Sequence, residues 1–311
     1  MVLIVIFIIL GLMALLCLNT LYKRTYAFQN QFIDVNKFKN LKDQDTFDIV
    51  NLGSNHPKFA FDYSNLGLKG MNWAVGPQTF QYDYAILKKY KKHLNPGAVV
   101  IIPVCPLKFF LLDTHWNNRV KYYSIFSKSE MPDYSAKQKV KEYILPLIFH
   151  PFRAKYIIRD IECDNRLSFI NNPLNEQQIS KDATFWIRKC WNPEFDIDIE
   201  NMQSLSEYNQ KSIEGNIRIL SDMIKFCIDN GFKPVLTMLP VTTALSSKFS
   251  EEFIQRHIIG YINRSNIHMV PVFNYFKDER FVTHDFYINS FFMNKIGRQI
   301  FTKSFVNELK F

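Results

Sequence analysis

The pattern of hydrophobic positions begins with an uncharged run. Residues 1–22 carry no charged side chain and are mostly Leu, Ile, Val, Met and Phe. A helix of about 20 such residues spans the hydrocarbon core of a bilayer and satisfies its own backbone hydrogen bonds there. A cleaved signal peptide would need basic residues before the run and small residues at its end. Neither is present, because bulky residues continue through Leu15–Leu18. We therefore predict a retained, single-pass anchor in the cell membrane.

The residues after this run bear on the orientation of the anchor and on its connection to the rest of the chain. Lys23 and Arg24 come directly after the run, and the positive-inside bias would place this end in the cytoplasm. Large domains can be exported against such a bias, so two charges do not decide the orientation. Residues 23–45 are polar and rich in Lys, Asn and Gln. We interpret them as a tether between the membrane and a folded domain.

Buried strands alternate with amphipathic helices in the remaining domain, residues 46–311. Ser204 and Glu207 have the spacing of a capping box at the start of the clearest helix. Residues 106–200 are rich in aromatics but weakly periodic, and are expected to be an insertion of short helices and loops. The pattern predicts strands at 47–52, 98–104, 234–239 and 268–273, and helices at 79–94, 204–230, 249–264 and 294–309. A second short apolar stretch follows the first strand at 71–75.

This order of elements indicates the fold class. Strands separated by helices form a parallel sheet that helices cover on both sides, a three-layer α/β/α domain. In such sheets, sites form beyond the carboxyl ends of the strands. That rule directs attention to three segments of this chain, residues 53–56, 104–106 and 240–243.

Composition narrows the classes of function. The net charge of +9 would suit an anionic lipid or an anionic polymer, but a Lys-rich solvated surface is the favoured interpretation. No dense Lys/Arg block interleaved with aromatics is present, so nucleic acid is not expected as a partner. No cysteine pair has CxxC spacing and no histidine lies beside a cysteine at metal-ligand spacing, so neither a metal nor another cofactor is expected. The five cysteines are Cys17, Cys105, Cys163, Cys190 and Cys227.

Several segments resemble a known superfamily in the same order. Residues 48–56 read Asp-Ile-Val-Asn-Leu-Gly-Ser-Asn-His, and Phe-Asp-Tyr follows at 61–63. This looks like the first block of the SGNH/GDSL hydrolases, and within them the membrane-anchored bacterial branch linked to cell-surface polysaccharide modification. Later blocks are matched by residues 70–74, 82–90, 237–242 and 289–302. The resemblance implies an SGNH hydrolase-like, flavodoxin-like domain that faces outward from the membrane.

The resemblance also assigns catalytic positions. In active relatives a Ser after the first strand attacks an acyl carbonyl, a His from the last block takes its proton, and an Asp orients that His. The nucleophile position here is Asn55 and the His position is Phe292. The acid position is either Asn289 or Phe291, depending on the relative followed. With all three replaced, the resemblance implies a catalytically degenerate member with a glycan-binding or accessory role. Its partners would be an acylated glycan or a polysaccharide-modifying enzyme.

A rearranged active site is the alternative. An active carbohydrate O-acyl esterase or O-acetyltransferase would have to recruit other residues, and Ser54, His284 and Asp285 are the candidates. For His284 and Asp285 we favour a solvated pair in a loop, without a catalytic role. Ser54 is one residue from the nucleophile position, so its side chain should point elsewhere.

Four further residues are expected to line the pocket, namely Gly53, His56, Gly76 and Cys105. His56 is too near Asn55 in sequence to serve as the usual base from the opposite loop. Cys105 would need an activating base to act as a nucleophile, and the sequence shows none, so a buried structural thiol is favoured. We predict that residues 53–56 face Phe291 and Phe292 at the end of the first strand.

Overall fold

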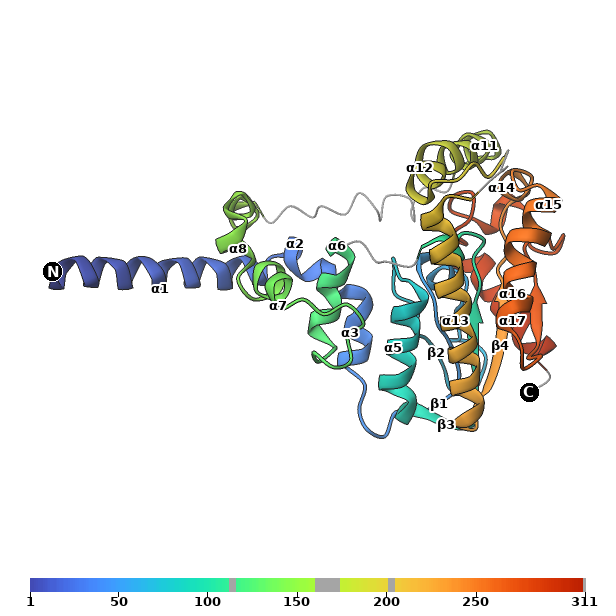
Figure 1. Ribbon diagram of the computed structural model, residues 1–311, viewed down its shortest axis with the longest axis horizontal. Coiled ribbons are helices and arrows are strands. Elements are labelled where there is room, and N and C mark those ends of the chain that lie inside the picture. Colours follow the sequence, from blue (N-terminus) through green and yellow to red (C-terminus); the bar gives the residue numbers. More distant parts are fainter. Residues whose placement is uncertain (112–115, 160–173, 201–204, 310–311) are drawn as a thin grey trace. The chain divides into compact units, whose positions relative to one another are not determined.

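A computed structural model describes residues 1–111, 116–159, 174–200 and 205–309 (Figure 1). The chain divides into two compact units. The N-terminal unit comprises Met1–Leu41 and His115–Asn165, and the sheet unit comprises Lys42–Thr114 and Arg166–Phe311. The predicted insertion at 106–200 is therefore divided between the units rather than forming one segment, and parts of it, together with Cys163, lie outside the described residues.

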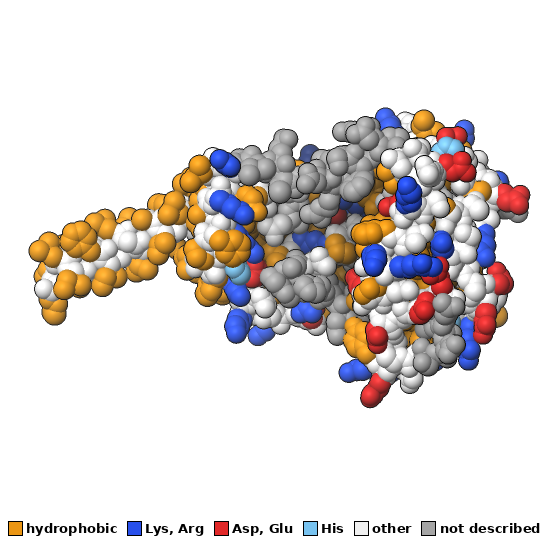
Figure 2. Space-filling view, turned by 90° about the horizontal axis from the view of Figure 1, so that it is seen from above, with side chains coloured by type: hydrophobic (Ala, Val, Ile, Leu, Met, Phe, Trp, Pro, Cys, Tyr) orange, Lys and Arg blue, Asp and Glu red, His pale blue; other side chains and the backbone are white. Residues whose placement is uncertain are grey.

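The first helix, α1, runs from Val2 to Arg24 and presents hydrophobic side chains along its length (Figure 2). By length and composition it suits a membrane span, and a signal sequence shares these properties. Its last turns differ, because Asn19 and Tyr22 are buried. The Asn19 carboxamide donates to the Ile144 carbonyl at 3.0 Å and accepts from the Leu147 amide at 3.0 Å. Protein contacts thus hold the carboxyl end of α1 within the N-terminal unit.

The segment predicted to be a tether, residues 23–45, is instead largely helical. It forms α2 (Tyr26–Gln29), η1 (Asn30–Phe32) and α3 (Ile33–Lys39). Phe28, Phe32, Val35 and Phe38 are buried at helical spacing within the polar sequence, and the Phe32 ring lies 5.7 Å from the Tyr143 ring. The average composition concealed this apolar stripe, which is why the prediction was wrong. The remaining elements of the unit are α6 (Trp116–Arg119), η4 (Val120–Ser124), α7 (Ala136–Gln138), η5 (Lys139–Ile144), α8 (Pro146–Phe149), η6 (Pro151–Ala154) and α9 (Lys155–Ile158).

A five-stranded parallel sheet forms the centre of the sheet unit. Its strands are β1 (Phe47–Asn51), β2 (Gly70–Asn72), β3 (Leu94–Pro103), β4 (Lys233–Met238) and β5 (Val272–Asn274). They lie in the order β2-β1-β3-β4-β5, and every neighbouring pair is parallel. Residues 98–103 and 234–238 are buried without interruption. Since successive side chains point to opposite faces, both faces of β3 and β4 are covered. The predicted α/β class with a parallel sheet is confirmed.

The helices of the sheet unit begin and end near their predicted positions. The longest, α13, runs from Glu207 to Asp229, and the Ser206 hydroxyl caps it by accepting from the Asn209 amide at 3.2 Å. The predicted cap, Ser204, lies outside the described residues. The other elements are α4 (Asn55–Lys58), α5 (Phe80–Tyr90), η2 (Lys91–His93), η3 (Lys108–Phe110), α11 (Glu176–Phe185), η7 (Trp186–Trp191), α12 (Asn192–Phe195), α14 (Thr243–Ser246), α15 (Glu251–Ile254), η8 (Gln255–Ile259), α16 (Gly260–Ser265), η9 (His284–Phe286) and α17 (Lys295–Glu308).

The last strand is shorter than predicted. Residues 268–273 are apolar enough for a strand, but β5 begins only at Val272. The Asn266 carboxamide bonds to both backbone groups of Val270, at 2.8 Å and 2.9 Å. This local side-chain bonding competes with strand pairing and turns the chain before β5 begins.

Candidate functional site

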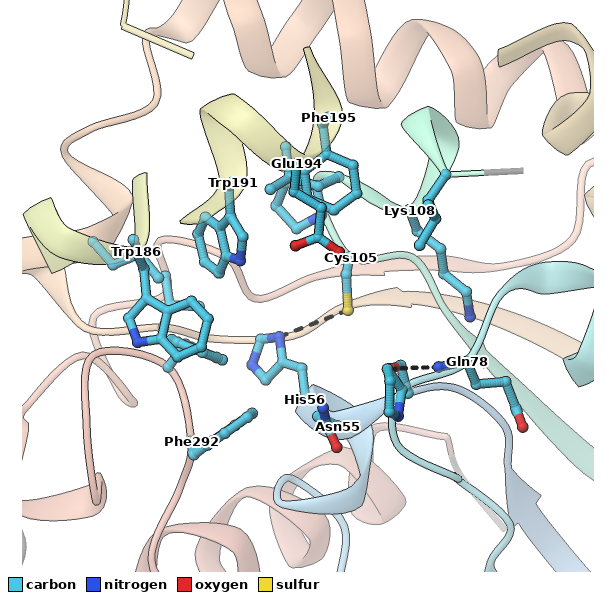
Figure 3. Close-up of a pocket in the computed structure, with 18 of the residues that line it drawn as sticks. Asn55, His56, Gln78, Cys105, Lys108, Trp186, Trp191, Glu194, Phe195 and Phe292 are labelled. Atoms are coloured by element: carbon cyan, nitrogen blue, oxygen red, sulfur yellow. Dashed lines mark hydrogen bonds between the residues drawn. The ribbon is translucent and has the colours of Figure 1, made fainter. Parts of the chain in front are cut away.

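A cavity of about 250 Å³ lies beyond the carboxyl ends of the strands in the sheet unit (Figure 3). The strand order changes direction between β1 and β3, the place where open parallel sheets form ligand sites. The loop after β1 supplies Ser54–His56, the loop after β3 supplies Cys105–Lys108, and Val241 follows β4. All three strand-end segments expected to form a site therefore contribute to one cavity.

Aromatic rings form the wall opposite the sheet. Trp186 and Trp191 of η7 place their rings 5.2 Å and 5.3 Å from Phe291, which lies 4.2 Å from Phe292, centroid to centroid. The Phe291 ring also makes an edge contact with the His56 ring, at 6.2 Å. Residues 53–56 thus face the two phenyl rings as predicted. Pockets with apolar walls and a few convergent polar groups are typical of ligand sites.

The loop that carries these phenyl rings is held by its own polar side chains. The Asn289 carboxamide oxygen accepts from the backbone amides of Phe291 at 3.1 Å and Phe292 at 2.7 Å. The Ser290 hydroxyl donates to Asp182 of α11 at 2.6 Å. Asn289, one of the two candidates for the acid position, therefore has a structural role, because it fixes the turn that presents Phe291 and Phe292 to the cavity.

A buried ionic network supports the loop after β1. Asp83 of α5 accepts from the Gly53 amide at 2.8 Å, from the Gln78 carboxamide, and from the Lys108 ammonium. Gly53 has φ of +114°, a conformation that glycine adopts far more readily than other residues. Gln78 also donates its backbone amide to the Ser54 hydroxyl at 3.0 Å. The candidate nucleophile Ser54 thus lines the cavity with its oxygen engaged as an acceptor.

The predicted glycines support the site instead of lining it. A Cβ atom on Gly76 would lie 1.6 Å from the Asn55 carboxamide oxygen, so only glycine leaves room for that side chain. Gly53 is buried under the same loop and is not among the residues that line the cavity. Of the four residues expected to line the pocket, His56 and Cys105 line this cavity. Gly53 and Gly76 lie behind it, where each lets the β1 loop turn or pack closely.

His56 and Cys105 form a pair that the sequence interpretation missed. The Cys105 sulfur lies 3.7 Å from Nδ1 of His56, and Nε2 of His56 lies 3.1 Å from the Pro240 carbonyl (Figure 3). A carbonyl can only accept, so Nε2 carries the proton and Nδ1 is free to accept from the thiol. The base that Cys105 lacked in the sequence is therefore present. It could have been found by noting that both residues follow strands that are neighbours in the sheet.

Burial keeps both members of the pair neutral. Burial lowers the pKa of His56 to about 4, and the hydrogen bond to Pro240 opposes this only in part. Burial raises the pKa of Cys105 to about 11, with Asp83 acting in the same direction and Lys108 against it. At pH 7 the pair is a thiol facing a neutral imidazole, whose Nδ1 can accept a hydrogen bond from the thiol.

The other candidates lie elsewhere. His284 and Asp285 approach each other to 3.3 Å, but their side chains are exposed and neither lines the cavity. Their exposure is that of a solvated pair in a loop. Within the part of the chain that the structure describes, no group of three or more His, Cys, Asp or Glu residues is placed to hold a metal ion.

No protein-family model matches the chain, and no curated protein matches its sequence.

Proposed function

We propose that the chain is a membrane-anchored binding protein of the SGNH/GDSL hydrolase-like type, whose cavity accepts an acylated glycan and which does not use the serine chemistry of active relatives. The sheet unit would be a three-layer α/β/α domain, and its strand order, β2-β1-β3-β4-β5, is of the flavodoxin-like kind. On this proposal the domain faces outward and serves surface-polysaccharide modification, alone or beside a modifying enzyme.

One observation carries the proposal. Asn55 and Phe292, which stand where the resemblance expects the nucleophile and its base, both line a cavity flanked by Trp186 and Trp191. The carboxamide can donate and accept hydrogen bonds but cannot attack a carbonyl as a hydroxyl does. The indoles and phenyl rings present flat apolar faces, to which the C–H face of a sugar or an acyl group can pack. On this proposal the cavity keeps surfaces that can bind a ligand and has no serine nucleophile at position 55.

Binding can be measured by titrating the full chain in detergent with glucose pentaacetate and, separately, with glucose, following tryptophan fluorescence. We expect saturable binding of the acetylated sugar only. Trp186→Ala and Trp191→Ala should each weaken it by about fivefold, since an aromatic contact contributes about 1 kcal/mol. Tyr208→Ala removes an exposed aromatic of α13 and is the matched control. Equal affinity for glucose, or unchanged affinity in both tryptophan variants, would contradict the proposal.

The same proposal predicts no steady-state hydrolysis of p-nitrophenyl acetate above buffer. Single reversions should not restore it, because triad members act as a unit. Asn55→Ser gives a nucleophile without a base, and Phe292→His gives a base with nothing to activate. Only the combined change with an acid at position 289 or 291 has the necessary parts. Asn289→Asp is the better acid variant, because a carboxylate can still accept from the Phe291 and Phe292 amides.

The outcome that contradicts this prediction is equally specific. Wild-type turnover well above buffer that is abolished by Ser54→Ala or by His284→Ala would show an active, rearranged hydrolase. Folding of each variant is checked by its thermal unfolding, so that loss of structure is not mistaken for loss of activity.

A further inference from the structure

Cys105 and His56 occupy the cavity with the geometry of a nucleophile and its base. The sulfur lies 3.7 Å from Nδ1, and the Pro240 carbonyl at 3.1 Å from Nε2 fixes the ring from its other side. A nucleophile within reach of a base, with the base oriented by a third group, is the general signature of covalent catalysis. Here three strand ends supply the three parts: His56 follows β1, Cys105 follows β3 and Pro240 follows β4.

The surroundings are those of a reacting group rather than of a thiol packed in a core. Cys105 is half-buried and lines the cavity, whereas Cys227 of α13 is fully buried away from it. In Figure 3 the Cys105 sulfur points toward His56, and the Glu194 carboxylate of α12 points toward the same space. Asn55 brings a carboxamide, a donor for a developing oxyanion, to the same cavity.

We propose that Cys105 is an acyl-accepting nucleophile, with His56 as its base, that takes an acyl group from an activated ester or thioester and passes it to a hydroxyl group of the bound glycan. This goes beyond the proposed function, on which only the identity of the acceptor rests. The aromatic wall of Trp186, Trp191, Phe291 and Phe292 offers apolar faces against which the acyl chain can pack.

The two steps balance in atoms and charge. As the sulfur attacks the carbonyl carbon of R–CO–X, Nδ1 of His56 takes the thiol proton, and the S–C bond forms. The C–X bond breaks, and the imidazolium returns the proton to X, which leaves as HX. In the second step an acceptor hydroxyl attacks the thioester carbon while His56 takes the hydroxyl proton. The C–S bond breaks, the proton goes to the sulfur, and the product is an ester with the thiol restored.

The test incubates the full chain in detergent with p-nitrophenyl acetate as the only acyl donor. We expect one equivalent of p-nitrophenolate, and one acetyl group on the peptide that contains Cys105, removable by neutral hydroxylamine as a thioester is. Cys105→Ala should abolish this label. His56→Gln keeps a donor for the Pro240 carbonyl but removes the base, and should slow acetylation by roughly 10²-fold. Cys190→Ser is the matched control and should acetylate at the wild-type rate.

A pH profile of the wild type keeps the proposal open to refutation even if His56→Gln does not fold. His56 and Cys105 are both neutral between pH 6 and 9, and the charged groups around them are Glu194, Lys108 and Asp83. The rate of acetylation should therefore be nearly constant over this range. An unassisted thiol instead reacts about tenfold faster for each pH unit below its pKa. Three results would overturn the proposal. The rate could rise tenfold per pH unit, Cys190 could be acetylated equally, or the acetyl group could be attached to Ser54 and resist hydroxylamine.

The outcomes also separate the two proposals. Saturable binding of glucose pentaacetate without acetylation of Cys105 would sink the acyl-acceptor role and leave the binding role intact. Acetylation of Cys105 without sugar binding would contradict the binding role and leave the acyl-acceptor role intact.

Discussion

Replacing Asp83 by alanine should lower the free energy of unfolding of the sheet unit by about 3–5 kcal/mol, the cost of removing one partner from a buried ion pair. The Asp83 side chain is fully buried, and that of its partner Lys108 is only 6% exposed. Without the carboxylate, the Lys108 ammonium stays in a poorly solvated place without its ion-pair partner. The Gly53 amide also loses its acceptor, so the β1 loop should loosen. Denaturant unfolding of the full chain in detergent, followed by tryptophan fluorescence, measures the change.

Two further variants test whether the loss of stability comes from the buried ion pair. Asp43 pairs with Lys92, but 93% and 63% of these side chains are exposed, so Asp43→Ala should leave stability almost unchanged. Asp83→Asn combined with Lys108→Met removes both charges and should recover much of what Asp83→Ala loses. Equal losses for Asp83→Ala and Asp43→Ala would show that the buried network does not stabilise the β1 loop as inferred.

The sheet unit should also lose stability between pH 6.5 and about 4 because of His56. Burial lowers the pKa of His56 in the folded state from 6.5 to about 4, so the unfolded state binds the proton more tightly. The contribution of neutral His56 is fully present above pH 6.5 and is lost progressively as the pH falls toward 4. A pKa change of this size corresponds to about 3 kcal/mol at most.

The measurement compares wild type with His56→Gln, because other groups titrate in the same range. Burial also lowers the pKa of His257, which contributes in the same direction in both proteins. The difference between the two free energies of unfolding should therefore shrink or change sign as the pH falls from 7 to 4. Parallel curves over this range would contradict the buried, neutral state of His56 on which the acyl-acceptor proposal depends.

Local pattern was sufficient to predict the central strands and the long helices of the sheet unit. The continuous apolar run at 98–104 appears as the buried part of β3, and the stripe through Ile213, Leu220 and Ile224 faces inward on α13. These elements are encoded by side chains close in sequence, whose spacing matches the period of a strand or a helix. The same local logic failed at 23–45, where average polarity concealed the buried aromatics of α2, η1 and α3.

The sequence predicted only part of the site. The rule on strand ends located the loops after β1, β3 and β4, and the resemblance placed residues 53–56 opposite Phe291 and Phe292. Neither revealed that His56 would turn away from Asn55 toward Cys105, which is 49 residues later and on the loop of a neighbouring strand. Nor did they predict that the indoles of η7, from a weakly periodic segment, would close the cavity.

The sequence by itself thus determined an apolar helix that can anchor the chain and a parallel α/β sheet. The assignment of Asn55, Phe292 and Asn289 or Phe291 to former catalytic positions stays a prediction from the resemblance. Only the tertiary structure decided which side chains meet. Strand order depends on packing summed over the whole unit rather than on local spacing, and it is the adjacency of β1, β3 and β4 that brings His56, Cys105 and Pro240 together.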